Sequence, residues 1–311
     1  MKYKYLFGPV PSRRLGVSLG IDIIPYKTCT LNCVYCECGR TTRLTATRKE
    51  YAPVKEVIYE LREYLQKEPE LDYVTFSGSG EPTLHSKIDI IIHFIKEYFP
   101  RYNVAVLTNG TLFTEEEVRV ALRRADLVIP SLDAAAEDVF KKLNRPHGSL
   151  SCEKVISGLA QFRKEYPGEI RLEVFIVPGL NDGEEHIAML RKAVQKINPD
   201  RIQLNTLDRP GAEPWVRTAR DEEIQQFAKY LGDNVEIIGK FKPRNGITSF
   251  SGKEQSILLT LKRRPCTAED LSYILRLPLL EVNKYLQMLL EKGQIVGEQQ
   301  KRGKFYKIIN R

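Results

Sequence analysis

The segment Cys29-Thr-Leu-Asn-Cys33-Val-Tyr35-Cys36 places three of the six cysteines of this 311-residue chain on one short stretch, and Cys38 follows two residues later. Disulfides are not expected, because the N-terminus lacks the apolar core of a signal peptide and the cytosol keeps thiols reduced. A zinc site is an alternative, although zinc usually takes two cysteine pairs separated by a longer segment. Three thiolates on one loop can instead each bind one iron of a cubane cluster, which leaves the fourth iron open to an outside ligand.

The segments around this cysteine loop alternate between strand and helix patterns from residue 17 to about residue 238. Strands are expected at 17–24, 73–76, 103–107, 127–132, 170–177, 202–207 and 235–238. Helices are expected at 54–66, 85–98, 114–124, 151–166, 184–197 and 221–231, the third of them capped by Thr114 in a capping box with Glu117. Six strand–helix units in succession predict an α/β fold with a parallel sheet and right-handed crossovers.

Polar and glycine-rich residues follow several of the predicted strands. The segment Phe76-Ser77-Gly78-Ser79-Gly80-Glu81-Pro82 comes after the second strand, where glycines let the backbone approach a ligand and Pro82 fixes the exit. A plain glycine-rich turn is the alternative for this segment. Further polar side chains at strand ends are Asn109, Ser131, Asp133 and Asn205. Each of them also suits a turn or a cap, so their shared position at strand ends is the stronger observation.

The cysteine spacing, with an aromatic residue just before the third cysteine, resembles that of the radical S-adenosylmethionine (SAM) superfamily. The resemblance implies a [4Fe-4S] cluster on Cys29, Cys33 and Cys36, with SAM bound to the open iron. It also implies reductive cleavage of SAM to a 5′-deoxyadenosyl radical, which abstracts hydrogen from a substrate. The fold it implies is a partial (β/α)6 TIM-like barrel with its site at the carboxyl ends of the strands. The SAM-binding residues implied by the resemblance are Tyr35, Ser77, Gly78, Ser79, Gly80, Glu81, Asn109, Ser131, Asp133, Val177 and Asn205.

A narrower resemblance rests on the segments Phe7–Arg14, Pro25–Thr28 and Asp208–Trp215. They are similar to a radical SAM group related to wyosine-type transfer-RNA-modifying enzymes, and the likeness covers most of residues 5–240. Those enzymes carry a second cluster on three additional N-terminal cysteines, whereas this chain has no cysteine before Cys29. We therefore carry over the radical SAM core and not the wyosine reaction.

The net charge of +8 is concentrated near the C-terminus. Residues 252–311 contain twelve Lys/Arg and six Asp/Glu, whereas the rest of the chain is close to neutral. A basic module of this kind indicates contact with a polyanion or a solvated lysine-rich surface. We expect a barrel domain at 1–240, a linker at 241–252, and a winged helix-turn-helix at 253–311 with helices at 254–261, 267–275 and 279–291 and a terminal hairpin.

The third of these helices would be the recognition helix of a nucleic-acid binder. Its polar side carries Lys284 and Gln287, and the wing tip carries Lys301, Arg302 and Lys304, which we expect to contact RNA or DNA. Winged helices also bind proteins or peptides, or dock against their own chain, and those alternatives stay open.

The leading hypothesis is a cytoplasmic radical SAM enzyme that receives electrons from a flavodoxin- or ferredoxin-type donor and acts on an unknown substrate, with RNA as a candidate. The apolar runs are too short to span a bilayer, so no membrane association is expected. One alternative is a peptide- or protein-modifying radical SAM enzyme that recognises its partner through the winged helix. Another is a non-enzymatic Fe-S- or SAM-responsive regulator that binds DNA.

Overall fold

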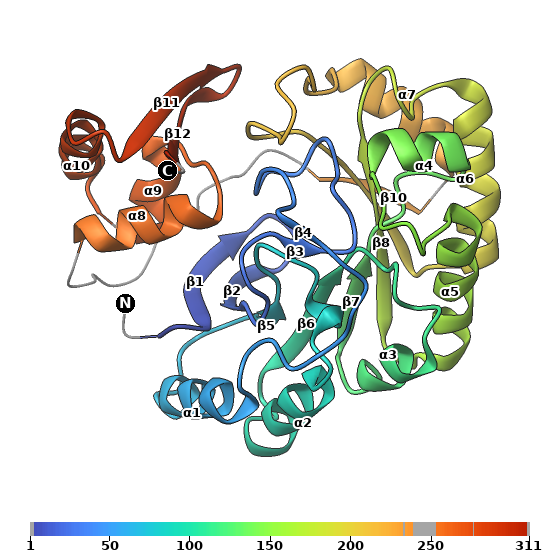
Figure 1. Ribbon diagram of the computed structural model, residues 1–311, viewed down its shortest axis with the longest axis horizontal. Coiled ribbons are helices and arrows are strands. Elements are labelled where there is room, and N and C mark those ends of the chain that lie inside the picture. Colours follow the sequence, from blue (N-terminus) through green and yellow to red (C-terminus); the bar gives the residue numbers. More distant parts are fainter. Residues whose placement is uncertain (1–2, 233, 239–252, 276, 310–311) are drawn as a thin grey trace.

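The computed structural model describes residues 3–232, 234–238, 253–275 and 277–309, and the predicted linker at 241–252 lies outside them. The described chain forms an α/β unit and a smaller C-terminal unit beside it (Figure 1). The two units have separate apolar cores, one built around the large sheet and the other around three C-terminal helices.

The large sheet has eight strands in the order β1-β2-β5-β6-β7-β8-β9-β10. Every neighbouring pair from β2 to β10 is parallel, whereas β1 is antiparallel to β2, so the parallel sheet expected from the sequence is confirmed. The strands are β1 (Leu6–Ser12), β2 (Gly16–Ile21), β5 (Tyr73–Phe76), β6 (Asn103–Thr108), β7 (Leu127–Pro130), β8 (Glu169–Ile176), β9 (Arg201–Thr206) and β10 (Val235–Ile237). This arrangement is consistent with a partial TIM-like barrel.

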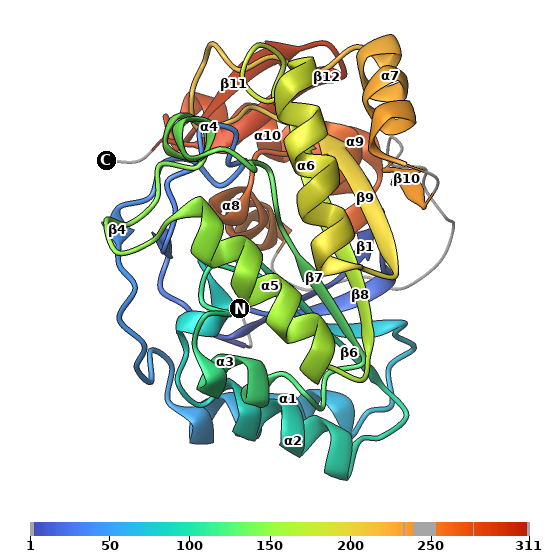
Figure 2. The same cartoon turned by 90° about the vertical axis from the view of Figure 1, so that its right-hand side faces the viewer.

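Helices connect successive parallel strands and cover the outside of the sheet (Figure 2). They are α1 (Val54–Leu65), α2 (Ile88–Tyr98), α3 (Glu116–Ala121), α4 (Glu137–Leu143), α5 (Cys152–Glu165), α6 (Glu184–Ile197) and α7 (Asp221–Leu231). Their apolar faces are buried at helical spacing, as in α1, where Val54, Val57, Leu61 and Leu65 point inward. Among the described residues, no helix is both long and apolar enough to cross a bilayer.

Three features of this unit differ from expectation. The segment Leu6–Ser12, for which no strand was expected, forms the edge strand β1; an edge position tolerates its prolines because one side of the strand needs no ladder partner. The predicted cap at Thr114 is wrong, because α3 begins at Glu116 after the extended residue Glu115 and has no side-chain cap. The short helix α4 was not predicted.

The C-terminal unit contains α8 (Lys253–Arg263), α9 (Ala268–Leu275), α10 (Leu279–Glu291) and the antiparallel pair β11 (Ile295–Gln300) and β12 (Gly303–Ile308). A capping box opens its second helix, because Thr267 and Asp270 exchange backbone-to-side-chain hydrogen bonds at 3.1 Å. The unit lies beside β1: α9 contacts that strand, and Val10 packs against the core of the C-terminal unit. It therefore covers the sheet edge that β1 would otherwise leave open.

Candidate functional site

The cysteine loop leaves β2 and lies directly against the glycine-rich segment that follows β5. The backbone N–H of Lys27 donates to the carbonyl of Ser79 at 3.1 Å, and the N–H of Glu81 donates to the carbonyl of Thr28 at 3.2 Å. Two short strands, β3 (Thr28–Cys29) and β4 (Arg43–Leu44), close the base of the loop. The two motifs singled out in the sequence are thus neighbours at the carboxyl edge of the sheet.

Each of the three cysteines in the motif has a nitrogen donor of its own. Asn109 Nδ2 lies 3.5 Å from Cys29 Sγ. Asn144 Nδ2 lies 3.4 Å from Cys33 Sγ, and Lys27 Nζ lies 3.1 Å from Cys36 Sγ. Nitrogen donors stabilise thiolate sulfur, which is the form in which cysteine binds metals.

The electrostatic surroundings of the three sulfurs differ. Burial and the nearby Glu81 carboxylate raise the pKa of Cys29 to about 12. Burial, followed by the charge of Asp133, also raises the pKa of Cys33. A hydrogen bond from Cys38 and the charge of Lys27 lower the pKa of Cys36, although burial opposes them. Cys36 is therefore the thiol of the three that loses its proton most readily.

Two glycines allow the close contact between the glycine-rich segment and its neighbours. A Cβ atom on Gly78 would lie 2.2 Å from Oδ1 of Asp22, and one on Gly80 would lie 2.3 Å from the carbonyl oxygen of Thr28. Ser79, between them, is buried and donates to Asp22 Oδ2 at 3.2 Å. Side chains at positions 78 and 80 would push this segment away from the cysteine loop.

The carboxylate of Glu81 is buried and already accepts four hydrogen bonds. Oε1 accepts from Thr83, through both the backbone N–H (3.0 Å) and the hydroxyl (2.6 Å), and from the Thr108 hydroxyl (2.6 Å). Oε2 accepts from the backbone N–H of Asn109 at 2.7 Å. Burial raises the pKa of Glu81 despite these bonds. Glu81 therefore ties the end of β5 to the end of β6 and positions the backbone of Asn109.

Asp133 joins three parts of the site. Its carboxylate accepts hydrogen bonds from the hydroxyl of Tyr35, from Asn144 Nδ2 at 2.8 Å and from the backbone N–H of Phe175 at 2.9 Å. The ring of Tyr35 also stacks on Phe175 with a centroid distance of 4.0 Å. Tyr35 and Asp133 thus hold the second half of the cysteine loop against β8.

The remaining predicted residues lie on the same edge of the sheet in different surroundings. Ser131 lines a small cavity together with Asn109 and Asp133. Val177 is buried in an apolar cluster beside the cysteine loop. Asn205 is buried, and its Nδ2 lies 3.4 Å from Oε2 of Glu173, which also pairs with Arg14.

Two residues next to the sulfurs, Lys27 and Asn144, were not predicted as part of the site. Asn144 follows α4 and not a strand, so it is not among the polar residues at strand ends. Lys27 stands two residues before Cys29 and has a positive φ of 54°. No residue pattern near Lys27 predicts this backbone conformation. The signal that the sequence does offer is a lysine two residues before the first cysteine of the motif.

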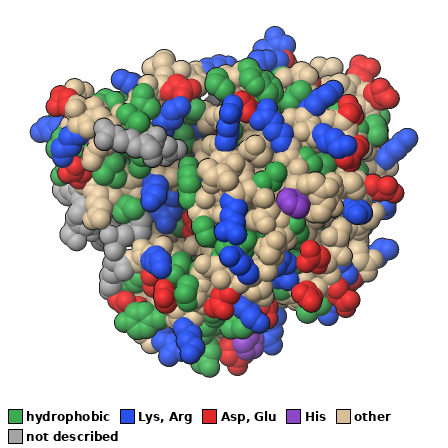
Figure 3. Space-filling model, in the orientation of Figure 1, with side chains coloured by type: hydrophobic (Ala, Val, Ile, Leu, Met, Phe, Trp, Pro, Cys, Tyr) green, Lys and Arg blue, Asp and Glu red, His purple; other side chains and the backbone are tan. Residues whose placement is uncertain are grey.

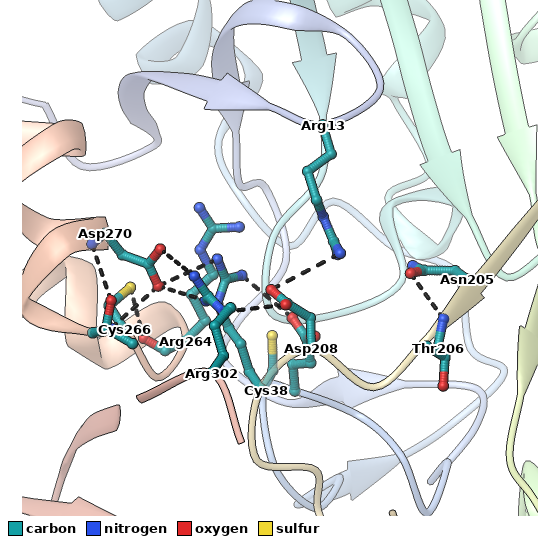
Figure 4. A network of polar contacts seen from close by, with 12 residues as sticks. Arg13, Cys38, Asn205, Thr206, Asp208, Arg264, Cys266, Asp270 and Arg302 are labelled. Carbon is teal, nitrogen blue, oxygen red and sulfur yellow. Dashed lines mark hydrogen bonds and ion pairs between the residues drawn. The ribbon is translucent and has the colours of Figure 1, made fainter. Parts of the chain in front are cut away.

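Residues at the end of β9 form ion pairs with the C-terminal unit (Figure 4). Arg302 binds the Asp270 carboxylate through two nitrogens at 2.9 and 2.8 Å, and its Nε lies 3.1 Å from Oδ1 of Asp208. Arg209 reaches Asp270 at 3.7 Å and Glu37, the residue after Cys36, at 3.4 Å. The same network therefore touches the cysteine loop, the barrel and the C-terminal unit.

The other residues expected to contact nucleic acid remain on the surface. Lys284, Gln287, Lys301 and Lys304 are exposed, although Gln287 bonds to Glu291 and Lys304 lies over the ring of Tyr306. On the face seen in Figure 3, Lys and Arg side chains are spread over both units and interspersed with acids. Arg302 differs from this set because its guanidinium points to Asp208 and Asp270.

Comparison with known proteins adds the family. The family model described as the radical SAM superfamily matches residues 23–191, more than half of the chain. A protein of Brachyspira hyodysenteriae named GTPase Obg is 38% identical over 307 residues, which is 96% of this chain and 44% of that protein. A UPF0026 protein of Methanocaldococcus jannaschii is 34% identical over 261 residues, which is 82% of this chain and 81% of that protein. The chain thus spans less than half of the first relative and most of the second.

A solved structure supports the fold. A radical SAM methyltransferase from Sphaerobacter thermophilus superposes with a TM-score of 0.53 at 18% sequence identity, covering 71% of this chain and 66% of that one. Together with the family match, this likeness agrees with the α/β fold and its parallel sheet. The alternative of a non-enzymatic regulator is set aside accordingly. The chain belongs to the radical SAM superfamily, groups with UPF0026 proteins, and is an enzyme that uses a [4Fe-4S] cluster and SAM.

Proposed function

We propose that Cys29, Cys33 and Cys36 bind the [4Fe-4S] cluster and that the enzyme acts by hydrogen abstraction on a substrate held at the carboxyl edge of the sheet. The observation that carries the proposal is the separate nitrogen donor beside each of the three sulfurs. Hydrogen bonds to sulfur ligands orient them and tune the cluster that they hold.

The donor set suits a cubane cluster better than a single metal ion. Among the described residues, no three His, Cys, Asp or Glu side chains are placed to bind one ion together. A cubane cluster does not require that, because each thiolate binds a different iron. When bound and reduced, the cluster supplies the electron that splits SAM into methionine and a 5′-deoxyadenosyl radical.

We propose that residues at this edge of the sheet position SAM. The backbone of residues 77–80 passes close to the cysteine loop because Gly78 and Gly80 carry no side chain, and it would hold the amino end of SAM. Glu81 acts through its bonds to Thr108 and the backbone of Asn109, which keep the end of β6 in place. Ser131 lines the adjoining cavity and would contact the rest of the cofactor.

The cluster assignment is tested by replacing each cysteine of the loop with alanine. After anaerobic reconstitution, Cys29→Ala, Cys33→Ala and Cys36→Ala should each lose iron and sulfide and release no 5′-deoxyadenosine from SAM and dithionite. The matched control is Cys38→Ala, on the same loop, which should retain iron and sulfide and still release 5′-deoxyadenosine. Equal loss of metal in all four variants would instead indicate a four-thiolate zinc site and would overturn the assignment.

We further propose that the C-terminal unit is a winged helix-turn-helix that brings RNA to the enzyme. The order of its elements, three helices followed by a hairpin, supports the first part. The exposed Lys284, Lys301 and Lys304 support the second, since phosphate contacts are made by such side chains.

RNA binding through phosphates has a distinctive salt dependence. Apparent affinity should fall steeply between low and moderate salt, and a triple Lys→Gln variant at positions 284, 301 and 304 should show a shallower slope. An affinity that does not change with salt would contradict this part of the proposal and would favour the peptide-modifying alternative.

A further inference from the structure

A group of arginines and acids lies where the C-terminal unit meets the carboxyl edge of the sheet (Figure 4). Four arginines come from four different segments: Arg13, Arg209, Arg264 and Arg302. Arg13 follows β1, Arg209 follows β9, Arg264 follows α8, and Arg302 lies in the turn of the terminal hairpin. We call these four residues the arginine group.

Three carboxylates form ion pairs with the arginine group. These ion pairs involve three of the four arginines. Asp208 is shared by Arg13 at 3.9 Å and Arg302 at 3.1 Å. Asp270 is shared by Arg302 and Arg209, and Glu37 pairs with Arg209. Within the part of the chain that the structure describes, the Arg264 guanidinium has no ion pair and no hydrogen-bond acceptor.

This arginine is partly buried, and the charges of Arg209, Glu37 and Asp270 all act on it. Burial, followed by the positive charge of Arg209, lowers the pKa of Arg264, and the two carboxylates oppose this shift without reversing it, so the surroundings disfavour the cation. A guanidinium nevertheless keeps its proton in proteins, so the charge persists and calls for a counter-anion. An unpaired charge that has left water is costly, and a bound anion relieves that cost.

Nearby guanidinium N–H groups are also without acceptors. The Nε atoms of Arg209 and Arg302 are buried and have no hydrogen-bond partner, although Arg302 Nε lies close to Asp208. The Arg209 side chain is 6% exposed, so water does not freely satisfy it. Asp208 Oδ2 is also buried without a hydrogen bond, and it lies 3.9 Å from Arg13. The arginine group therefore has two unused Nε donors and one unused acceptor, and its four arginines outnumber the three carboxylates.

We propose that the arginine group is a binding site for an oxyanion, which the unpaired Arg264 would bind. The ligand chemistry is a carboxylate or phosphate group, because a planar guanidinium donates two parallel hydrogen bonds to either. Glu37 directly follows Cys36, and Asp208 and Arg209 lie two and three residues after the end of β9, so the site adjoins the cysteine loop at the carboxyl edge of the sheet. On the proposed function above, the oxyanion belongs to the substrate and anchors it beside the cofactor.

The test uses the full chain, loaded with its cluster and saturated with SAM, so that the carboxylate subsite of SAM is already filled. Inorganic phosphate and acetate are titrated separately at constant ionic strength, by calorimetry under anaerobic conditions and by thermal unfolding. The unsubstituted protein should bind at least one of them saturably and unfold at a higher temperature when it is bound. Preference for phosphate or for acetate identifies which of the two groups the site receives.

Three variants locate the binding. Arg264→Gln should weaken it roughly tenfold or more, because a charge-assisted hydrogen-bond pair is lost. Arg264→Lys should retain part of it, and Arg191→Gln, on the exposed face of α6, should leave it unchanged. Without added oxyanion, Arg264→Gln should unfold at the same or a higher temperature than the unsubstituted protein, because an uncompensated charge has been removed.

Three results would overturn the inference. The anions bind Arg264→Gln as tightly as the unsubstituted protein, or neither anion binds the unsubstituted protein saturably, or Arg264→Gln is destabilised when no anion is added. The last result would show that Arg264 already has a structural partner. None of these readouts requires SAM cleavage. A protein that cleaves SAM and binds neither anion contradicts only the oxyanion site, and one that binds the anion and does not cleave SAM contradicts only the proposed function.

Discussion

The side-chain amide of Asn144 lies 3.4 Å from the sulfur of Cys33, although the two residues are 111 positions apart in the chain. The same nitrogen donates to Asp133 at 2.8 Å, so it uses both of its protons. The oxygen of the amide is buried and has no hydrogen-bond partner among the described residues. The amide orientation is therefore set by its two acceptors, a sulfur and a carboxylate.

Replacing Asn144 with alanine should weaken cluster binding without abolishing it. The Cys33 sulfur loses the hydrogen bond from Asn144, whereas Asp133 keeps the bonds from Tyr35 and Phe175. Loss of such an outer-shell partner typically costs about 10- to 100-fold in metal affinity or activity. Iron retention during stepwise chelation measures the effect. The control is Asn32→Ala, which removes a side-chain oxygen that accepts from the backbone N–H of Thr41. Equal retention in the two variants would contradict this role.

Gly80→Ala should separate the glycine-rich segment from the cysteine loop. The new Cβ would lie 2.3 Å from the carbonyl oxygen of Thr28 and 2.5 Å from a methyl of Ile24, so the backbone must shift. We expect a loss of about 1–3 kcal/mol in the free energy of unfolding, together with loss of SAM binding. Gly148→Ala meets no atom within 4 Å and serves as the control. Denaturant unfolding and SAM titration measure the two effects, and an unchanged SAM affinity in Gly80→Ala would count against the assigned role.

Arg302→Gln should loosen the C-terminal unit from the barrel. The variant loses a bidentate pair with Asp270 and the contact with Asp208, at a position where the two acids are 5% and 10% exposed. Charge-assisted bonds of this kind contribute about 1.5–3 kcal/mol. The neighbouring Lys301 is exposed, so Lys301→Gln should be neutral. Amide hydrogen exchange of β1 reports on the interface and should become faster in Arg302→Gln. Exchange as slow as in the unsubstituted protein would show that Arg302 does not hold the two units together.

Asp270 should make the stability of the chain depend on pH in the acid range. Burial by itself would raise its pKa, but hydrogen bonds from Arg302 and the charge of Arg209 outweigh burial and hold the pKa below its usual value. The stability it contributes is therefore complete above the unfolded pKa of about 3.9 and is lost as pH falls through the lower folded pKa.

The variant Asp270→Asn isolates this contribution. Its unfolding temperature should lie furthest below that of the unsubstituted protein near neutral pH, and the gap should narrow below about pH 4. Glu269→Gln, at the exposed neighbouring position, should show no such narrowing. A gap that stays constant down to the lowest pH would rule out the ionised carboxylate as its source.

The sequence predicted the repeated core of the fold well because its signals are local. The helices α6, α7 and α10 begin and end where their apolar spacing predicted. No strand was expected at β1, whose proline-containing segment suits an edge position, and the edge is defined only once the sheet is assembled. The cap at Thr114 failed because the chain makes a further turn before α3 starts.

The candidate site was predictable in its motifs and not in its supporting contacts. Parallel strands bring their carboxyl ends to one edge, so the meeting of the cysteine loop with residues 77–81 followed from topology. The donors beside the sulfurs, Lys27 and Asn144, depend on long-range packing that leaves no periodic pattern. The sequence likewise does not predict that the Arg302 side chain points to Asp208, since a residue at a hairpin tip can face solvent or its own chain.

The coverage of β1 by α9 has a consequence for protein engineering. Excising the C-terminal unit as a cassette would bare an edge strand, strip Val10 of its apolar neighbours, and leave Asp208 without Arg302. A chimaera that grafts this unit onto a related barrel would need to transplant the matching acids and apolar residues as a set. A graft of the C-terminal unit should therefore include both sides of its interface with the barrel.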